Sequence, residues 1–332
     1  MKTKIFFAAS AVAMLLSCES KTEGLDNVAD KQYADLQLTM LTDDTKASGE
    51  GDDGDAAVSS YQVLIYDSSN KMLEVYATPD PTSNTFTVQC TTGPKDIVVL
   101  ANAPDVSHVV SYRDLLETHS YLTDNSIGNL VMEGKVSTTL SSLGTNVAVN
   151  LRRIVSKVVL TGINVDFEND AYDGMDFILK NVYLTNVSGS RTYLGYNGET
   201  EVWYNKNKRN DTNGEVDAMI YDKIDDVNLK DSKEYTAQHH FYAYPNPNTN
   251  DIFTKDWSPR PTRLVVEAEL GGVLYYYPVL LPELNQNVKY YVSLNIVRPG
   301  ATSPEQDMDK YAAEFTVEVD GWDGPEDVTE TI

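Results

Sequence analysis

The stretch that decides the fold is Tyr33 to Leu41, YADLQLTML, in which apolar and polar side chains alternate. Leu36, Leu38 and Met40 recur with a period of two, so an extended chain places all three on one face. Similar alternating segments fill much of the chain, separated by stretches rich in turn residues; the main ones are residues 58–66, 71–76, 86–90, 97–100, 154–165, 177–187, 264–270, 273–281, 289–297 and 313–319. Many short strands broken by turns predict an all-β fold built from β-sandwiches.

The sequence also predicts how these strands are divided along the chain. A helix is indicated only over residues 111–122, where apolar side chains fall at helical spacing. The polar residues 205–235 are expected to form a loop-rich insertion, and a domain boundary is expected near Asn150. We therefore predict one β-sandwich over residues 47–150, a second over residues 151–332, and one short helix.

The N-terminal segment MKTKIFFAASAVAMLLSC predicts export from the cytoplasm. Two lysines precede an apolar run over residues 5–16, which is too short to span a bilayer. The run ends in Leu-Leu-Ser-Cys18, which resembles the lipobox of bacterial lipoproteins, whose cysteine is acylated and becomes the mature N-terminus. An ordinary secretory signal with a chance cysteine is the alternative. We expect a signal peptide over residues 1–17, lipidation at Cys18, and a lipidated propeptide over residues 18–46 that contains the first strand.

Charge and cysteine content exclude some classes of function. The formal net charge is −24, and so acidic a surface repels nucleic acid, which is therefore not expected as a partner. Once Cys18 carries lipid, Cys90 has no partner for a disulfide bond. We expect Cys90 to be a small residue of the core.

The residues that carry chemistry in enzymes form no recognisable site in this sequence. No nucleophile elbow or phosphate-binding loop is present. His239 and His240 are adjacent, so a strand would point them to opposite faces rather than towards one metal ion. Acidic clusters at residues 52–55 and 170–176 lack the spacing of a calcium loop and are expected to be solvated, and the sequon at Asn186 carries little weight. The sequence predicts no enzyme, no cofactor and no metal site.

Several segments together are similar to landmarks of Bacteroidota fimbrillins, the type V pilins. They are VVLANAP at 98–104, MEG at 132–134, LRRIVSKV at 151–158, FYAYPN at 241–246, LNQNVKYYV at 284–292, VRPG at 297–300 and FTVEVDGW at 315–322. No one segment is specific to this family, but their order and spacing together with the lipobox are. The resemblance covers nearly the whole chain.

The resemblance implies a fold and a route of assembly. Fimbrillins have tandem transthyretin-like Greek-key β-sandwiches and are exported as lipoproteins to the outer membrane. A trypsin-like protease cuts in the loop after the first strand, and a C-terminal strand of another subunit fills the opened groove. The implied partners are other fimbrial subunits, the maturation protease and the outer membrane, and the implied location is the cell outer membrane and then the extracellular fimbrium, where the subunit supports adhesion.

The residues present suit this route. Lys46-Ala47 follows the first strand in an acidic loop and is the only basic position between Lys31 and Lys71. Cleavage there would release the lipid anchor together with Leu36, Leu38 and Met40. A sandwich that lacks a strand exposes an unpaired edge to which another strand can add. At the C-terminus the expected donor side chains are Phe315, Val317, Val319, Trp322, Val328 and Ile332.

Two alternatives remain open at this point. Residues 324–327, GPED, interrupt the terminal strand, and a tail that cannot insert would make the protein a fimbrial tip or anchor subunit. A permanently anchored surface lipoprotein that binds glycan or host protein is the other alternative. Aromatic anchors for it would be Trp203-Tyr204, Tyr242 and Trp257.

Overall fold

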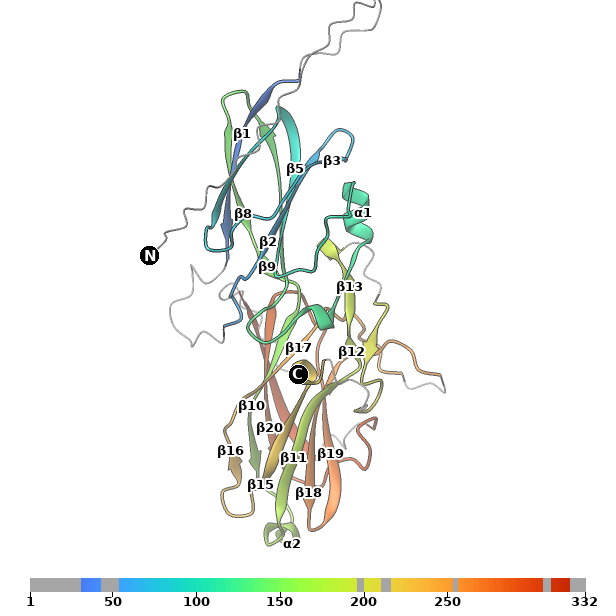
Figure 1. Ribbon diagram of the computed structural model, residues 1–332. Helices are drawn as coiled ribbons and strands as arrows, with labels where there is room; N and C mark the ends of the chain where they lie inside the picture. Colours follow the sequence, from blue (N-terminus) through green and yellow to red (C-terminus); the bar gives the residue numbers. More distant parts are fainter. Residues whose placement is uncertain are drawn as a thin grey trace, which may run out of the picture.

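The computed structural model describes residues 31–42, 54–195, 200–209, 216–252, 256–306 and 312–322. Two β-sandwiches lie end to end along one long axis (Figure 1). The predicted all-β fold is therefore confirmed. The residues predicted for lipidation and cleavage and the last two donor positions lie outside the described residues; they are Cys18, Lys46, Ala47, Val328 and Ile332. Within the described ranges no helix is long and apolar enough to cross a bilayer.

The first sandwich packs a three-stranded sheet on a five-stranded one. The smaller sheet has the order β4-β1-β8, with β4 at Thr85–Thr91, β1 at Tyr33–Leu41 and β8 at Thr145–Asn150. The larger sheet has the order β3-β2-β5-β7-β9; its strands are Leu73–Ala77, Tyr61–Asp67, Gly93–Ala101, Met132–Leu140 and Arg152–Arg153.

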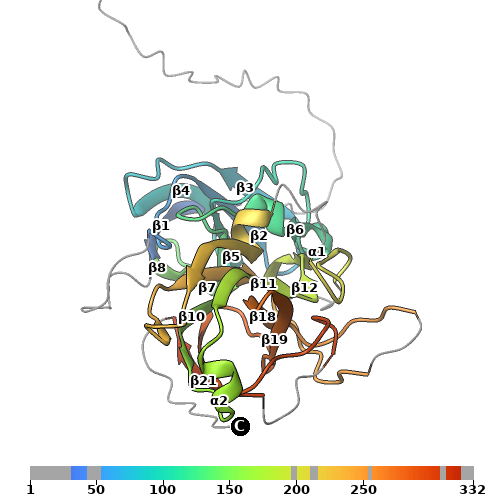
Figure 2. The same ribbon diagram turned by 90° about the horizontal axis from the view of Figure 1, so that it is seen from below.

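The second sandwich is built from two longer sheets. One has the order β15-β11-β18-β19, with strands at Tyr221–Asn228, Phe177–Thr185, Arg263–Leu270 and Val273–Leu280. The other has the order β16-β10-β20-β21, and β17 also pairs with β10; these strands are Glu234–Tyr235, Ser156–Val165, Val288–Ile296, Ala313–Gly321 and, for β17, His239–Ala243. The view from below the molecule shows α2 (Asp170–Asp173) at the end of this sandwich that is far from β1 (Figure 2).

Backbone pairing also connects the two sandwiches. β13 (Ser190–Thr192) pairs with β6 (His119–Tyr121), although these strands lie about 70 residues apart in the sequence. A further short pair, β12 (Val187–Ser188) with β14 (Trp203–Tyr204), lies beside it. The two sandwiches are thus joined by strand pairing as well as by the chain that links them.

The predicted helix over residues 111–122 is too long. Ser111 is a good N-cap, since its side chain accepts a hydrogen bond from the Asp114 backbone and the Asp114 carboxylate accepts one in return. The helix, α1, covers only Tyr112–Glu117 and ends at Thr118, whose backbone is extended. The following residues are drawn into β6 by pairing with β13, so a tertiary contact overrides the helical spacing.

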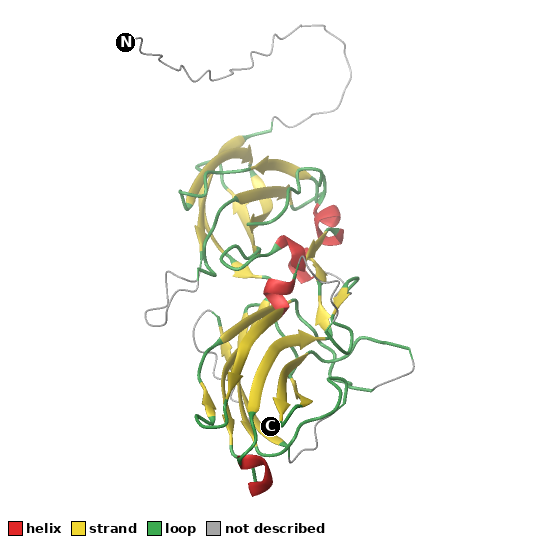
Figure 3. Ribbon diagram, turned by 60° about the horizontal axis from the view of Figure 1, so that its bottom comes forward, coloured by secondary structure: helices red, strands yellow, loops and turns green. Residues whose placement is uncertain are grey.

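Two further predictions about secondary structure are wrong. The described part of the stretch over residues 205–235 is not mainly loop, because it contains α3 (Asp217–Ile220), β15 and β16, and β15 pairs with β11. Nor is there a single short helix, since α1, α2 and α3 are all present, together with the 3-10 turns η2 (Leu122–Asp124) and η3 (Tyr193–Gly195). Strands nevertheless dominate, and short helices lie near the junction of the sandwiches and at the far end (Figure 3).

The central strands β2 and β5 of the large sheet in the first sandwich are buried on both faces. Val63, Ile65, Ile97 and Val99 face a core that they share with β1. The alternate residues of the same strands, Leu64, Tyr66, Val98 and Leu100, belong to a second core that continues into the second sandwich. Residues 61–66 of β2 and 95–101 of β5 are all buried, so neither face of these two strands is open to solvent there, whereas β3 is half-buried along its length.

Candidate functional site

β1 is the central strand of the small sheet, and it has a partner along each edge. It pairs antiparallel with β4, from Tyr33 opposite Thr91 to Thr39 opposite Thr85. It pairs parallel with β8, from Leu36 beside Thr145 to Leu41 beside Asn150. Figure 1 shows β1 beside β8 at the end of the molecule that is far from α2. Removing β1 would therefore leave two strands without their shared neighbour.

The inward face of β1 supplies much of the first core. Leu36 and Leu38 are fully buried, and Ala34 and Met40 are nearly so. They pack with side chains of the large sheet and with Cys90, which lies opposite Ala34 in the register. Burial raises the pKa of the Cys90 thiol to about 11, with a smaller contribution from Glu74. The expectation that Cys90 is a small core residue is confirmed.

An ion pair between the buried Lys95 and the half-buried Glu74 lies beside one end of the place that β1 occupies between β4 and β8, here called the groove. The Lys95 ammonium lies 2.6 Å from a Glu74 carboxylate oxygen and 2.8 Å from the Thr91 hydroxyl, at the end of β4. Burial raises the pKa of Glu74, but hydrogen bonds from Lys95 and Thr91 outweigh burial and lower it overall. A hollow of about 340 Å³ opens beside this pair, lined by Tyr33, Glu74 and Thr91 among others.

The terminal strand β21 has a different setting. It pairs with β20 along its whole length, from Ala313 opposite Ile296 to Gly321 opposite Val288. Among the described strands β20 is its only neighbour, so β21 is an edge strand. Val317 is buried in its own sandwich, whereas Phe315 and Val319 are half-buried.

The two domains meet at a cluster of charged and aromatic side chains, here called the joint cluster: Asp55, Arg153, Lys157, Tyr242 and Trp322. Asp55, which is 4% exposed, accepts hydrogen bonds from Lys157 Nζ at 2.7 Å and from the Tyr242 hydroxyl at 2.8 Å. Its carbonyl accepts one from Arg153 Nε at 2.9 Å. The Trp322 ring stacks on Tyr242, with the Arg153 guanidinium 4.6 Å from its centroid.

Sequence reasoning missed the joint cluster. The expectation that the acidic residues 52–55 are solvated is wrong for Asp55, because Lys157 from the second domain neutralises it in the interior. One signal was available: Lys157 interrupts the apolar run from Ile154 to Leu160, where an unpaired lysine would be costly.

The aromatic residues considered as glycan anchors are embedded in structure. Tyr242 is buried in the joint cluster and cannot be a surface anchor. Trp203 and Trp257 are half-buried and pack on each other at a tilt of 60°, with ring centroids 5.4 Å apart. Tilted rings do not form a flat platform for a sugar.

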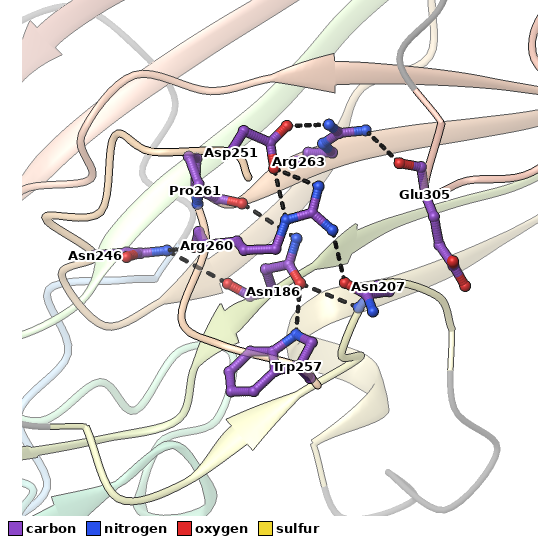
Figure 4. A network of polar contacts seen from close by, with 9 residues as sticks. All are labelled: Asn186, Asn207, Asn246, Asp251, Trp257, Arg260, Pro261, Arg263 and Glu305. Atoms are coloured by element: carbon purple, nitrogen blue, oxygen red, sulfur yellow. Dashed lines mark hydrogen bonds and ion pairs between the residues drawn. The ribbon is translucent and has the colours of Figure 1, made fainter. Parts of the chain in front are cut away.

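A polar network fixes this loop region (Figure 4). Asn186, which is 1% exposed, accepts hydrogen bonds from Trp257 Nε1 at 3.3 Å and from the Asn207 backbone at 3.0 Å. Arg260 and Arg263 both bind the Asp251 carboxylate. Asn186 is thus a structural residue, and burial of its amide leaves no room for a glycan at the sequon.

The adjacent histidines face opposite ways, as expected. His239 is buried and lies 2.7 Å from both Asp222 and the Tyr235 hydroxyl, whereas His240 faces the outer side of its sheet. Within the described ranges no three acidic, histidine or cysteine side chains are grouped so that they could hold a metal ion. The acidic residues 170–176 form α2 and the turn after it. Asp173, the last residue of α2, has a carboxylate oxygen 2.6 Å from Lys233 Nζ.

Comparison with known proteins identifies the family. The family model for the major fimbrial subunit protein (FimA) matches residues 34–222. The major fimbrium subunit FimC of Porphyromonas gingivalis is 25% identical over 221 residues, which are 64% of this chain and 44% of that protein. The chain therefore matches less than half of the length of this curated relative.

Solved structures agree on the fold. A putative cell adhesion protein from Bacteroides eggerthii has a TM-score of 0.65 at 18% identity, covering 90% of this chain and 98% of that one. A fimbrilin (FimA) from Porphyromonas gingivalis has a TM-score of 0.61 at 16% identity, and the match covers 89% of this chain and 99% of that one.

The matched residues begin inside β1 and run through the first sandwich into β15 of the second. They include β4, β8, β6 and β13, and also Asp55, Arg153 and Lys157 of the joint cluster, but not Tyr242 or Trp322. The family is one of structural fimbrial subunits and not of enzymes. This chain belongs to the major fimbrial subunit protein (FimA) family.

Proposed function

We propose that this chain is a structural subunit of a cell-surface fimbria that is made as a lipoprotein, cleaved at Lys46-Ala47 by a trypsin-like protease, and polymerised by donor-strand exchange. The carrying observation is the place of β1 at the centre of the β4-β1-β8 sheet, directly before the segment that contains Lys46. Cleavage after Lys46 would separate β1 and the lipid at Cys18 from the rest of the chain. The subunit would then leave the outer membrane and enter the extracellular fimbrium.

The loss of β1 is costly enough to require a replacement. Burial of Leu36, Leu38 and Met40 contributes about 1.5–3 kcal/mol each, or about 5–9 kcal/mol together. Small domains are stable by only about 5–15 kcal/mol. A first sandwich without β1 would thus retain little stability until another strand enters between β4 and β8.

The side chains of β21 match those of β1 position by position. β1 reads Ala34-Asp-Leu36-Gln-Leu38-Thr-Met40, and β21 reads Ala313-Glu-Phe315-Thr-Val317-Glu-Val319. Both strands begin with a small apolar residue and an acidic one, and both continue with large apolar side chains at every second position. We infer that β21 of another copy enters the groove with Ala313 at the place of Ala34.

The ten residues that follow Trp322 match the groove less well. Their even positions include Val328 and Ile332, which are the predicted donor side chains, but also Glu326 and Glu330. Burying two carboxylates without partners in an apolar groove would cost several kcal/mol each. The part of the predicted donor segment that carries Phe315, Val317 and Val319 therefore suits the groove better than the part beyond Trp322.

Exchange of β21 is favourable in the number of strand pairings. In its own sandwich β21 has β20 as its only described neighbour. In the groove it would lie between β4 and β8 and pair with both. One pairing is given up and two are gained, which offsets the burial lost from the second sandwich.

Trypsin treatment of the purified precursor, followed by N-terminal sequencing and denaturing gels without boiling, tests this proposal. We expect a new N-terminus at Ala47 and a ladder of multimers that resist detergent. Lys46→Gln should block both, whereas Lys31→Gln, which removes a lysine before β1, should block neither. A product that starts at Ala47 and stays monomeric when concentrated would contradict the proposal, and so would mature surface protein that keeps lipid on Cys18.

A further inference from the structure

We propose that the outer face of the sheet formed by β17, β10, β20 and β21 carries a binding groove for a neutral oligosaccharide. This inference goes beyond the proposed role in assembly and concerns the subunit before strand exchange, while β21 is still paired with β20. A hollow of about 770 Å³ lies on this face. A second hollow of about 370 Å³ adjoins it and shares Thr161, Ser293 and Thr316 with it.

The strand register places the lining residues in a row across the sheet. Val159 of β10 lies between His240 of β17 and Tyr291 of β20, and Tyr291 lies beside Glu318 of β21. Val159 is 1% exposed, so it forms the floor, and the longer side chains on either side form the walls. The half-buried Tyr291 thus lines the hollow beside a narrow apolar floor.

The joint cluster closes one end of the groove. Lys157 lines this end, and its charge is neutralised by Asp55. Lys289 lines it too, with its ammonium 5.6 Å from the centroid of the Trp322 ring, and it lies opposite Asp320 in the register. Each cation at this end has an acidic neighbour, so the groove has little net charge to attract an ion.

The remaining polar groups suit hydroxyl groups. The hydroxyls of Ser293 and Thr316 can both donate and accept hydrogen bonds, and the amide of Gln238 offers both kinds of group. The Thr161 hydroxyl donates to the Val292 carbonyl at 3.0 Å, so it can act towards a ligand as an acceptor. Sugar hydroxyls have the same double capacity, and a sugar ring has an apolar face that can pack on an aromatic ring. A groove of this size that is mainly polar suits a chain of two or three sugars better than an apolar ligand.

Other occupants fit less well. The chain has a formal charge of −24, which repels polyanions such as sulfated glycans. The acidic residues that follow Trp322 would be repelled by Glu318 and Asp320 of β21. A second copy of the chain would need a more apolar surface, since the cores of homodimer interfaces are richer in apolar area than this face.

The groove is complete only while β21 stays paired with β20, because Thr316, Glu318 and Asp320 form one wall. The measurement therefore uses the monomeric chain over residues 19–332, without trypsin, so that its result does not depend on assembly. The probes are an array of neutral and sialylated oligosaccharides and then titration calorimetry with the neutral probe that binds best.

We expect binding to neutral probes that Tyr291→Ala weakens at least about tenfold, because the variant removes the one tyrosine that lines the larger hollow. Tyr276→Ala removes a half-buried tyrosine from the other sheet and should leave binding unchanged. Thr316→Lys places a long charged chain into the groove from an exposed position, so it should block binding without disturbing the core. Thermal melting of each variant checks that the fold is retained.

The variant Glu318→Gln distinguishes a neutral sugar ligand from a cationic ligand. A glutamine still accepts hydrogen bonds from hydroxyls, so this variant should bind within about threefold of the wild type. Loss of binding in Glu318→Gln as complete as in Tyr291→Ala would indicate a cationic ligand and overturn the proposal. It would equally be overturned if no neutral probe bound, if sialylated probes were preferred, or if Tyr291→Ala abolished a dimer seen by sedimentation.

Discussion

β1 and β21 carry nearly the same alternating side chains but occupy opposite kinds of position. β1 lies at the centre of a sheet, pairs with β4 and β8, and buries four side chains almost completely. β21 lies at an edge, pairs with β20, and leaves Phe315 and Val319 half-buried. The comparison teaches that the pattern of a strand predicts which face it buries, whereas its neighbours decide how much stability depends on it.

Deleting each strand should give the largest difference. We expect removal of residues 19–46 to abolish protection from hydrogen exchange in both β4 and β8, because both lose their shared partner and about 5–9 kcal/mol of burial. A chain that ends at Ala312 should lose protection mainly in β20. Peptide-resolved hydrogen–deuterium exchange on dilute monomers measures both, and protection of β4 and β8 that survives loss of β1 would contradict this account.

Breaking the joint cluster should loosen the end of β21 without affecting β1. Lys157→Met leaves the Asp55 carboxylate buried without its cation, which is expected to cost about 3–5 kcal/mol. Urea unfolding gives the size of the loss, and hydrogen exchange shows where it falls. Adding Asp55→Asn to the same chain should recover most of the stability. If the double variant were no more stable than Lys157→Met alone, the ion pair would not be the cause.

Single core truncations sharpen the comparison further. Leu38→Ala should destabilise the precursor by about 2–5 kcal/mol, because Leu38 is fully buried between two neighbours. Val317→Ala should cost the precursor about 1.5–2.5 kcal/mol, since fewer carbons are removed at an edge. In the fimbria the order should reverse, because β1 is gone and Val317 would take the place of Leu38. Dissociation of assembled fimbriae in urea measures this, and an effect of Leu38→Ala on mature fimbriae would contradict it.

The smallest effect concerns pH. The pKa of Glu74 is lowered by its hydrogen bonds to Lys95 and Thr91, although burial opposes this. The stabilisation from this carboxylate is therefore fully present above its ordinary value of 4.5 and is lost as pH falls through the lowered pKa. Glu74→Gln should flatten that part of the profile of melting temperature against pH. Glu74, Lys95 and Thr91 all lie outside β1, so the effect should persist in the mature protein.

Local patterns predicted the strands well. The alternation of residues 33–41 gave β1 with its observed bounds, and Phe315, Val317 and Val319 were placed correctly on β21. These assignments succeed because one buried face imposes a period of two on the sequence. The helical spacing of apolar side chains placed the start of the helix at residue 111, which the structure shows to be the N-cap of α1.

Contacts between residues that are distant in the chain could not be predicted from the sequence. Residues 119–121 form a strand instead of the predicted helix because they pair with β13. Tyr221–Asn228 forms a strand because it pairs with the edge of β11. The pairing of Asp55 with Lys157 joins residues about 100 positions apart. Nothing in the acidic run around Asp55 indicated that one of its members would be buried.

The most direct test of the central claim uses Cys90, which lies opposite Ala34 in β1. If β21 of another copy replaces β1 in the same register, Ala313→Cys should form a disulfide with Cys90 of the neighbouring subunit in assembled fimbriae. Cys90→Ser should abolish the bond, and Ala34→Cys in the precursor should form it within one chain. The account predicts covalent multimers for Ala313→Cys and none for Val328→Cys. Multimers for Val328→Cys alone would contradict it, because the segment beyond Trp322 would then be the donor.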